Sequence, residues 1–218
     1  MAPAQNLVSL ILCFSILLAV SAIFWQQELR FLLPTPVPAH YDPIAVHEKL
    51  QLSQYLESDR LDRPVFLHFF NPGCACSQFN LDHFQRLIRE YRGKADIYLV
   101  LQSQHPQDTE SFREKYKLDI PVILDNDEAI ARLCGVYSTP QAVILDQQGR
   151  LYYRGNYNKT RYCTLPGSNY AQIALDSLLA RKAPPSLEPA AYVAYGCQLP
   201  SQQNLKSLLF LNPVDNAK

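Results

Sequence analysis

The sequence lacks an excess of charge of either sign, because its 20 lysines and arginines balance its 20 aspartates and glutamates. The basic residues also form no run, and a protein that binds nucleic-acid phosphates needs a basic patch or stripe, so that function class is disfavoured. Six cysteines in 218 residues are too few for a disulfide-stapled scaffold, although they suffice for a redox or metal site. With 48% apolar and 18% charged residues, most of the chain should fold as one domain with appendages.

An uncharged apolar run of 19 residues extends from Leu7 to Trp25. As a helix it is roughly 28 Å long, close to the thickness of a bilayer's hydrocarbon core. We predict an uncleaved membrane anchor. A cleaved signal peptide is the alternative, since residues 20–22 have the small-residue spacing of a cleavage site, but no Lys or Arg precedes the run. Arg30, which follows it, favours a cytosolic domain by the charge rule.

Composition divides the chain into four segments. We expect the anchor in residues 1–25, a Pro-rich linker in 26–43, a folded domain in 44–182 and an irregular tail in 183–218. Apolar periodicity predicts helices over Ile44–Ser58, Phe79–Tyr91, Thr109–Lys117, Asn126–Leu133 and Ser168–Arg181, and strands over Val65–Phe70, Ala95–Leu101, Pro121–Leu124, Gln141–Leu145 and Leu151–Arg154. The alternation of strands and helices before a final hairpin predicts a three-layer α/β fold with a mixed sheet covered on both faces.

Two cysteines lie where a buried strand passes into a helix, in the segment Phe69–Ser77. A thiolate at Cys74 meets unpaired backbone N–H groups and the positive end of the helix dipole, which lowers its pKa and makes it nucleophilic. Cys76 is close enough in sequence to resolve a mixed disulfide formed at Cys74. The alternatives are a metal-binding pair and two buried structural cysteines.

From about residue 45 to residue 182 the chain resembles the thioredoxin fold, and within it the membrane-anchored thiol–disulfide oxidoreductases and their redoxin relatives. Two stretches carry the resemblance: Phe69–Cys74, and Ile120–Asp146 followed by Gly149-Arg150. The resemblance implies that Thr139-Pro140 is a cis-proline pair facing Cys74. It also implies that the Thr139 backbone offers strand-like pairing to an extended substrate.

The chain departs from the family pattern around the first cysteine. Gly73 stands where the family usually has Trp, a single residue separates Cys74 from Cys76, and Ser77 occupies the usual position of the second cysteine. Three mechanisms therefore stay open: Cys76 resolves Cys74, Cys74 acts alone, or a distant thiol resolves it.

His68 lies six residues before Cys74, where thioredoxin itself has a buried acid. Its imidazole can accept a proton from the resolving thiol near neutral pH. It can equally be a core histidine bonded to a backbone carbonyl. His68, Cys74 and Cys76 together can also form a soft site for Cu(I), which prefers thiolates.

Three further cysteines lie beyond this region. Cys134 follows an apolar helix face and is expected to be inert core. Cys163, in the insertion 155–167, and Cys197, in the tail, are expected outside the core and are predicted to form a second redox pair. Two free surface thiols are the alternative, and a variant has one of these cysteines resolving Cys74 instead.

The sequence thus predicts a membrane-anchored thiol–disulfide oxidoreductase that exchanges or reduces disulfides of protein substrates through Cys74 and Cys76, with an upstream redox partner. Several thiols are expected outside the core and the membrane, which suits a compartment in which disulfides persist. We therefore expect the domain to be extracytoplasmic, and periplasmic in a bacterium, despite the opposite orientation suggested by Arg30. No cofactor is expected, and no metal either, because no third thiol lies near Cys74 and Cys76 in sequence. The alternatives are a copper-handling binding protein and a redox-inactive interaction module.

Overall fold

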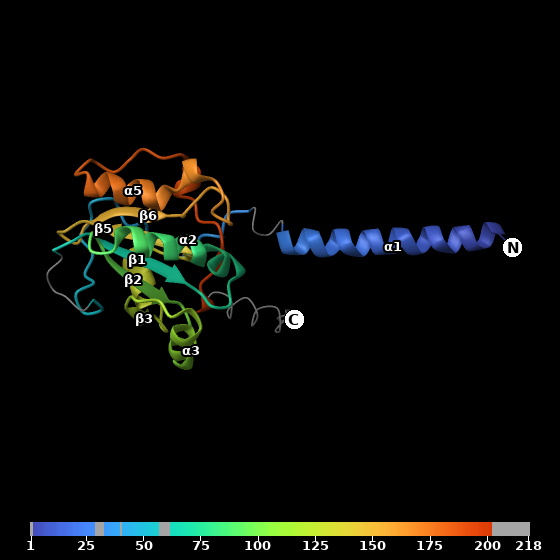
Figure 1. Cartoon of the computed structure of the whole chain (residues 1–218), viewed down its shortest axis with the longest axis horizontal. Helices are drawn as coiled ribbons and strands as arrows, with labels where there is room; N and C mark the ends of the chain where they lie inside the picture. The colour runs from blue at the N-terminus through green and yellow to red at the C-terminus, as the bar shows by residue number, and fades with distance from the viewer. Residues whose placement is uncertain (1, 29–32, 40, 57–61, 202–218) are drawn as a thin grey trace, which may run out of the picture. The chain divides into compact units, whose positions relative to one another are not determined.

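The computed structural model describes residues 2–28, 33–39, 41–56 and 62–201 (Figure 1). The chain forms two compact units, Met1–Pro34 and Thr35–Lys218. The first unit contains helix α1 (Ala2–Glu28), in which Asn6–Trp25 is long and apolar enough to cross a membrane. A signal sequence near an N-terminus has the same length and composition. Arg30, on which the charge rule for a cytosolic domain depended, lies outside the described residues.

The second unit is built on a five-stranded mixed sheet. Its strands, in spatial order, are β3 (Val122–Leu124), β2 (Asp96–Leu101), β1 (Val65–Phe70), β5 (Gln141–Leu145) and β6 (Leu151–Gly155). The first three run parallel, whereas β5 is antiparallel to β1 and β6 is antiparallel to β5. All five predicted strands are therefore present within one residue of their expected bounds.

Helices cover both faces of this sheet. The core on one face includes residues of α2 (Ala75–Tyr91), α3 (Gln107–Tyr116) and α5 (Tyr170–Leu179). On the other face the core includes α4 (Ala129–Cys134) and residues of the segment 44–56. Figure 1 shows α5 lying along the sheet beside β6. The predicted three-layer α/β fold is confirmed.

The central strand β1 positions the rest of the domain, because all six of its residues are buried. Phe66 and Phe70 enter the core on the α2 and α5 face, and Leu67 and Phe69 enter the core on the α4 face. A strand with an apolar layer on each side needs this nearly continuous hydrophobic run rather than an alternating one.

The helix predicted over Ile44–Ser58 is wrong for the described residues, which form turns and a single bridge between Lys49 and Arg150. The backbone N–H of Leu50 donates instead to the carbonyl of Gly149, at 2.9 Å, as an added edge on the β5–β6 hairpin. The Leu50 side chain is buried in the core on the α4 face of the sheet. Tertiary pairing thus replaces the local helix that the apolar spacing favoured. Residues 57 and 58 lie outside the described part of the chain.

The C-terminal segment was expected to be irregular, but part of it is ordered and packed on the domain. It contains a 3₁₀ turn (Pro189–Ala191) and a short strand, β7 (Cys197–Gln198), that pairs antiparallel with β4 (Ser138–Thr139). Ala191, Ala194 and Leu199 are buried. The tail is therefore part of the folded unit as far as residue 201.

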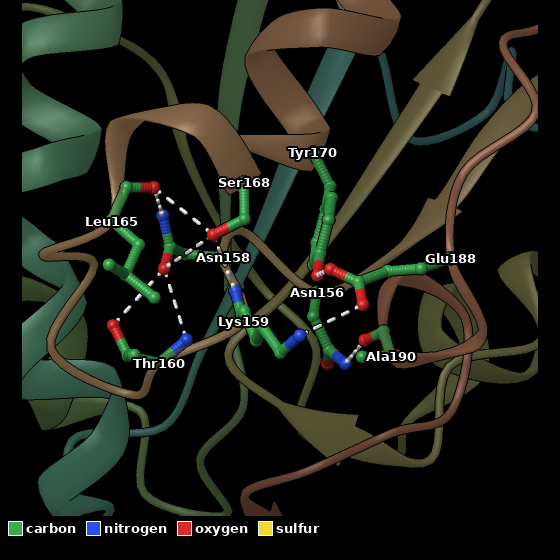
Figure 2. A network of polar contacts seen from close by, with 9 residues as sticks. All are labelled: Asn156, Asn158, Lys159, Thr160, Leu165, Ser168, Tyr170, Glu188 and Ala190. Atoms are coloured by element: carbon green, nitrogen blue, oxygen red, sulfur yellow. Dashed lines mark hydrogen bonds and ion pairs between the residues drawn. The ribbon is translucent and has the colours of Figure 1, made fainter.

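Side chains of the insertion after β6 hold the start of this tail (Figure 2). The Asn156 amide donates to the carbonyl of Ala190 at 2.7 Å. Glu188 forms an ion pair with Lys159 at 3.0 Å and accepts a hydrogen bond from the hydroxyl of Tyr170. Because the tail is bonded both to the insertion and to Tyr170 of α5, its path across the domain is fixed before it reaches β7.

We expect Asp125→Ala to lower the free energy of unfolding by at least about 2 kcal/mol, because three buried donors lose their acceptor. The Asp125 carboxylate accepts the backbone N–H groups of Ile130 and Ala131, both at 2.9 Å, and the amide of Gln102 at 2.7 Å. Urea unfolding of the full chain in detergent measures the loss. Asp127→Ala is the control, since this exposed carboxylate accepts only a 3.2 Å bond, from the backbone N–H of Ala129 at the start of α4. Equal losses for the two variants would contradict the assignment.

Candidate active site

Cys74 lies at the point where β1 leads into α2, as the N-terminal cap residue of that helix. The loop before it is fixed by Asn71, whose side-chain oxygen accepts the N–H of Gly73 at 2.8 Å and whose carbonyl accepts the N–H of Cys74 at 3.0 Å. The hydroxyl of Ser77 accepts the N–H of Asn71 at 3.3 Å. Ser77, at the usual position of a second cysteine, therefore stabilises the loop that presents Cys74.

Cys74 forms a disulfide with Cys197, which lies 123 residues further along the chain, with their Cα atoms 5.9 Å apart. The predicted bridge between Cys163 and Cys197 is wrong, because Cys163 carries a free thiol. Cys76, expected to be the partner of Cys74, also remains a thiol in this structure. The pairing present is the variant in which a distant tail cysteine bonds to Cys74.

The loop opposite Cys74 has the predicted geometry, since the Thr139–Pro140 peptide bond is cis. The Thr139 carbonyl oxygen lies 3.5 Å from Cys74 Sγ, a contact without a hydrogen bond because a disulfide sulfur has no proton. Thr139 of β4 pairs with Cys197 of β7, and Ser138 pairs with Gln198. The backbone edge expected to receive a substrate strand is thus occupied by the chain's own tail.

Two residues that the sequence analysis did not identify allow the tail to lie so close to Thr139. Gly196 has a φ of +148°, and a Cβ at this position would clash with the Thr139 carbonyl oxygen. Thr35 donates its N–H to the Ala194 carbonyl at 2.8 Å and its hydroxyl to the Gly196 carbonyl at 3.2 Å. The glycine directly before Cys197 was a signal of this close approach, whereas nothing local marks Thr35.

The structure brings a third sulfur to the pair. The Sγ atoms of Cys74, Cys76 and Cys197 all lie within 4.8 Å of one another. Cys74 is fully buried and Cys76 is nearly so, at 0% and 3% exposed, whereas Cys197 is partly exposed. Three sulfurs at this spacing can exchange a disulfide among themselves, and as thiolates they can ligate a soft metal ion.

His68 lies in the core rather than in hydrogen-bonding contact with a thiol. Its Nδ1 is 2.6 Å from the Tyr157 hydroxyl, and its ring stacks on Phe84 with centroids 3.9 Å apart. Burial, with a smaller effect of neighbouring His83, lowers the pKa of His68 to about 3, so the imidazole is neutral at pH 7. The expected proton transfer near neutral pH stays a prediction. His68 is buried as in the core-histidine alternative, but its partner is the Tyr157 hydroxyl and not a backbone carbonyl.

The two other cysteines of the domain are buried to different degrees. Cys134 is fully buried, and burial raises the pKa of its thiol, in agreement with inert core. Cys163 packs against the core, contrary to expectation, and its sulfur accepts a hydrogen bond from the Asn80 amide at 3.0 Å. Burial raises the pKa of Cys163 to about 11, which disfavours its thiolate at neutral pH.

Comparisons with known proteins agree with this geometry. The sequence profile of a family described as a domain of unknown function (DUF6436) matches residues 44–199. The thiol–disulfide oxidoreductase ResA of Halalkalibacterium halodurans is 22% identical over 88 residues, which are 40% of this chain and 50% of the relative. ResA of Geobacillus thermodenitrificans is 22% identical over 110 residues, which are 50% of this chain and 63% of the relative. The chain thus spans less than two thirds of these curated relatives.

The fold itself recurs in a solved structure. A hypothetical protein from Sinorhizobium meliloti 1021 superposes with a TM-score of 0.59 at 14% identity, covering 72% of this chain and 95% of the other. The sheet order, the cis-proline loop and the ResA relatives together confirm a thioredoxin-like fold related to the thiol–disulfide oxidoreductases.

We expect the free energy of unfolding to fall between pH 7.5 and pH 5. Burial lowers the pKa of His68 to about 3, and burial together with Arg86 lowers that of His83 to about 4. The unfolded chain therefore binds protons below its ordinary histidine pKa of about 6.5 that the folded protein does not bind. Stability is fully present above that value and is lost as the pH falls towards the folded values. His68 alone accounts for about 2 kcal/mol at pH 5.

Urea unfolding of the oxidised full chain at the two pH values measures this difference. His68→Phe should be less stable at both, because Tyr157 loses its partner, and should show a smaller difference between them. His105→Phe is the control, since this histidine is exposed. A pH difference that His68→Phe leaves unchanged would exclude His68 as its source.

Proposed function

Because the chain belongs to the DUF6436 family, whose domain has no known function, its activity has to be argued from the site, and we propose that it is a thiol–disulfide oxidoreductase acting on protein substrates. The observation that carries the proposal is the Cys74–Cys197 disulfide at the N-terminus of α2, beside the cis Thr139–Pro140 loop. The ResA relatives support the same chemistry.

In the reducing direction, Cys74 is the nucleophile. Without its disulfide, its thiolate is stabilised by the N–H groups and the dipole of the 17-residue helix α2. It attacks a substrate disulfide, forms a bond to one substrate sulfur and releases the other as a thiolate. The Cys197 thiolate then attacks Cys74 Sγ, which releases the second substrate sulfur and forms the Cys74–Cys197 bond.

This cycle moves two electrons from the protein to the substrate. A dithiol protein upstream returns the electrons in the reducing direction. Thr139 is the backbone position at which an extended substrate strand pairs, since β7 pairs there in the oxidised chain. Cys76, within 4.8 Å of both sulfurs, is the competing resolving thiol.

The apolar helix α1 anchors this activity to a membrane, with the domain on the extracytoplasmic side. A disulfide such as Cys74–Cys197 persists in oxidising compartments and is rare in the cytosol of mesophiles, which supports this orientation.

Cysteine variants of the full chain in detergent micelles test the proposal, with insulin as substrate and dithiothreitol as reductant. Cys74→Ser should reduce insulin no faster than dithiothreitol alone, because the nucleophile is gone. Cys197→Ser should accumulate a Cys74–insulin mixed disulfide, visible on non-reducing gels. Cys163→Ser, which replaces a cysteine outside the pair, should keep the wild-type rate.

Insulin reduction by Cys74→Ser at the wild-type rate would refute the oxidoreductase assignment. Normal turnover by Cys197→Ser, together with a trapped mixed disulfide in Cys76→Ser, would move the resolving role to Cys76.

A second candidate function is binding of a soft metal ion such as Cu(I), which the three-sulfur cluster favours. The expectation of a metal-free site rested on the absence of a third thiol near Cys74 and Cys76, and the fold supplies that thiol as Cys197. In the reduced chain all three are candidate ligands, and thiolates suit Cu(I).

Titration of the reduced full chain with Cu(I) against a chromogenic chelator separates the two functions. We expect disulfide exchange to persist and Cu(I) to compete weakly. One tightly held Cu(I) per chain, lost in both Cys74→Ser and Cys197→Ser and accompanied by negligible insulin reduction, would make metal binding the function instead.

A further inference from the structure

The two cysteines of the disulfide differ in their exposure to solvent. Cys74 is 0% exposed, whereas Cys197 is partly exposed. Thiol–disulfide exchange requires the incoming thiolate to reach the sulfur with which it bonds. In this conformation an external thiolate cannot reach Cys74.

The cover over Cys74 is held by more than the disulfide. On the N-terminal side of Cys197, Gly196 lies against the Thr139 carbonyl and its own carbonyl accepts the hydroxyl of Thr35. On the C-terminal side, Leu199 is buried in the core, at 2% exposed. Beyond it, the Glu128 carboxylate accepts the backbone N–H of Ser201 at 2.8 Å and its hydroxyl at 2.5 Å. The tail is thus bonded on both sides of β7.

The two sulfurs also differ as leaving groups. Cys74 caps the N-terminus of α2, where the helix dipole and the backbone N–H groups of the first turn stabilise a thiolate, while Cys197 lies in a two-residue strand without such an environment. Exchange is faster when the departing thiolate has the lower pKa. Attack at Cys197 expels Cys74, the better leaving group. Access and leaving-group chemistry therefore favour the same sulfur.

We propose that Cys197 is the residue through which electrons enter the oxidised protein, and that its electron donor is a dithiol protein which attacks the tail rather than the cysteine at the helix terminus. This inference rests on the proposed oxidoreductase function.

The reaction is balanced in two steps. The first thiolate of the donor forms a bond to Cys197 Sγ, the Cys74–Cys197 bond breaks, and Cys74 leaves as a thiolate. The second thiolate of the donor then attacks the donor's first sulfur, which is bonded to Cys197. This step releases the Cys197 thiolate and leaves the donor with a disulfide, oxidised by two electrons. Solvent supplies and accepts the protons.

The position of the first mixed disulfide tests the proposal. Oxidised full-length protein in detergent is treated briefly with glutathione, a monothiol that cannot carry out the second step. The mixture is quenched with acid and alkylated with N-ethylmaleimide. Trypsin separates Cys74 from Cys197, because Arg86 and Arg181 lie between them. We expect glutathione on Cys197 and maleimide on Cys74, which peptide fragmentation distinguishes from Cys76 on the same tryptic peptide, in about tenfold excess over the reverse labelling, a ratio equivalent to about 1.4 kcal/mol.

A tail variant tests the physical cause. Gly196→Ala adds a Cβ that clashes with the Thr139 carbonyl, so β7 must move off β4 and uncover Cys74. The excess of Cys197 labelling should then shrink by about tenfold or more, since a side chain at this φ strains the backbone. Gly167→Ala is the control, because a Cβ there meets nothing within 4 Å.

Glutathione found mainly on Cys74 of the wild-type protein would overturn the proposal. So would an excess of glutathione on Cys197 over Cys74 that is the same in the wild type and in Gly196→Ala. Either result leaves the oxidoreductase function intact. A disulfide that resists glutathione, dithiothreitol and a protein dithiol alike would instead refute the oxidoreductase function itself.

Discussion

The pairing of β7 with β4, locked by the Cys74–Cys197 bond, is the constraint on which the architecture of the site depends. It places a tail sulfur at the N-terminus of α2, covers Cys74 and fills the backbone edge beside the cis-proline loop. A cross-link over 123 residues also removes conformational freedom from the unfolded chain, an effect of about 4–5 kcal/mol for a loop of this order. Redox state and stability are consequently coupled. Reduction breaks the Cys74–Cys197 bond and also restores conformational freedom to the unfolded chain, which lowers the free energy of unfolding.

Sequence patterns predicted the structure correctly where residues close together in the sequence determine it. The run Val65–Phe70 is apolar except for His68 because it is buried on both faces, and the resemblance around Thr139-Pro140 located a loop whose shape a proline determines. The same reasoning failed at residues 44–56. The apolar spacing there is compatible with a helix. In the structure, however, backbone N–H and carbonyl groups that a helix would use form hydrogen bonds with the β5–β6 hairpin instead.

The cysteine connectivity could not be predicted in the same way, because spacing along a chain does not determine which thiols meet. Cys163 and Cys197 both lie after the sheet is complete, and the choice between them depends on the path of the tail across the insertion. That path is set by hydrogen bonds such as those from Asn156 to the carbonyls of Ala190 and Val193, at 2.7 and 2.6 Å. Cys163 instead lies beside Asn80 on α2, in a partly buried position where its thiol resists ionisation.

The separation of the two bonded cysteines also has a consequence for biosynthesis. Chains are made from the N-terminus at about 5–20 residues per second, so the 123 residues between Cys74 and Cys197 take roughly 6–25 s to synthesise. During that interval α2 and the strands from β2 to β6 are synthesised, but the residue that covers Cys74 is made only at its end. The nascent protein thus passes through a stage in which the Cys74 thiol is not covered, and β7, the last strand in the described part of the chain, is the one that covers it.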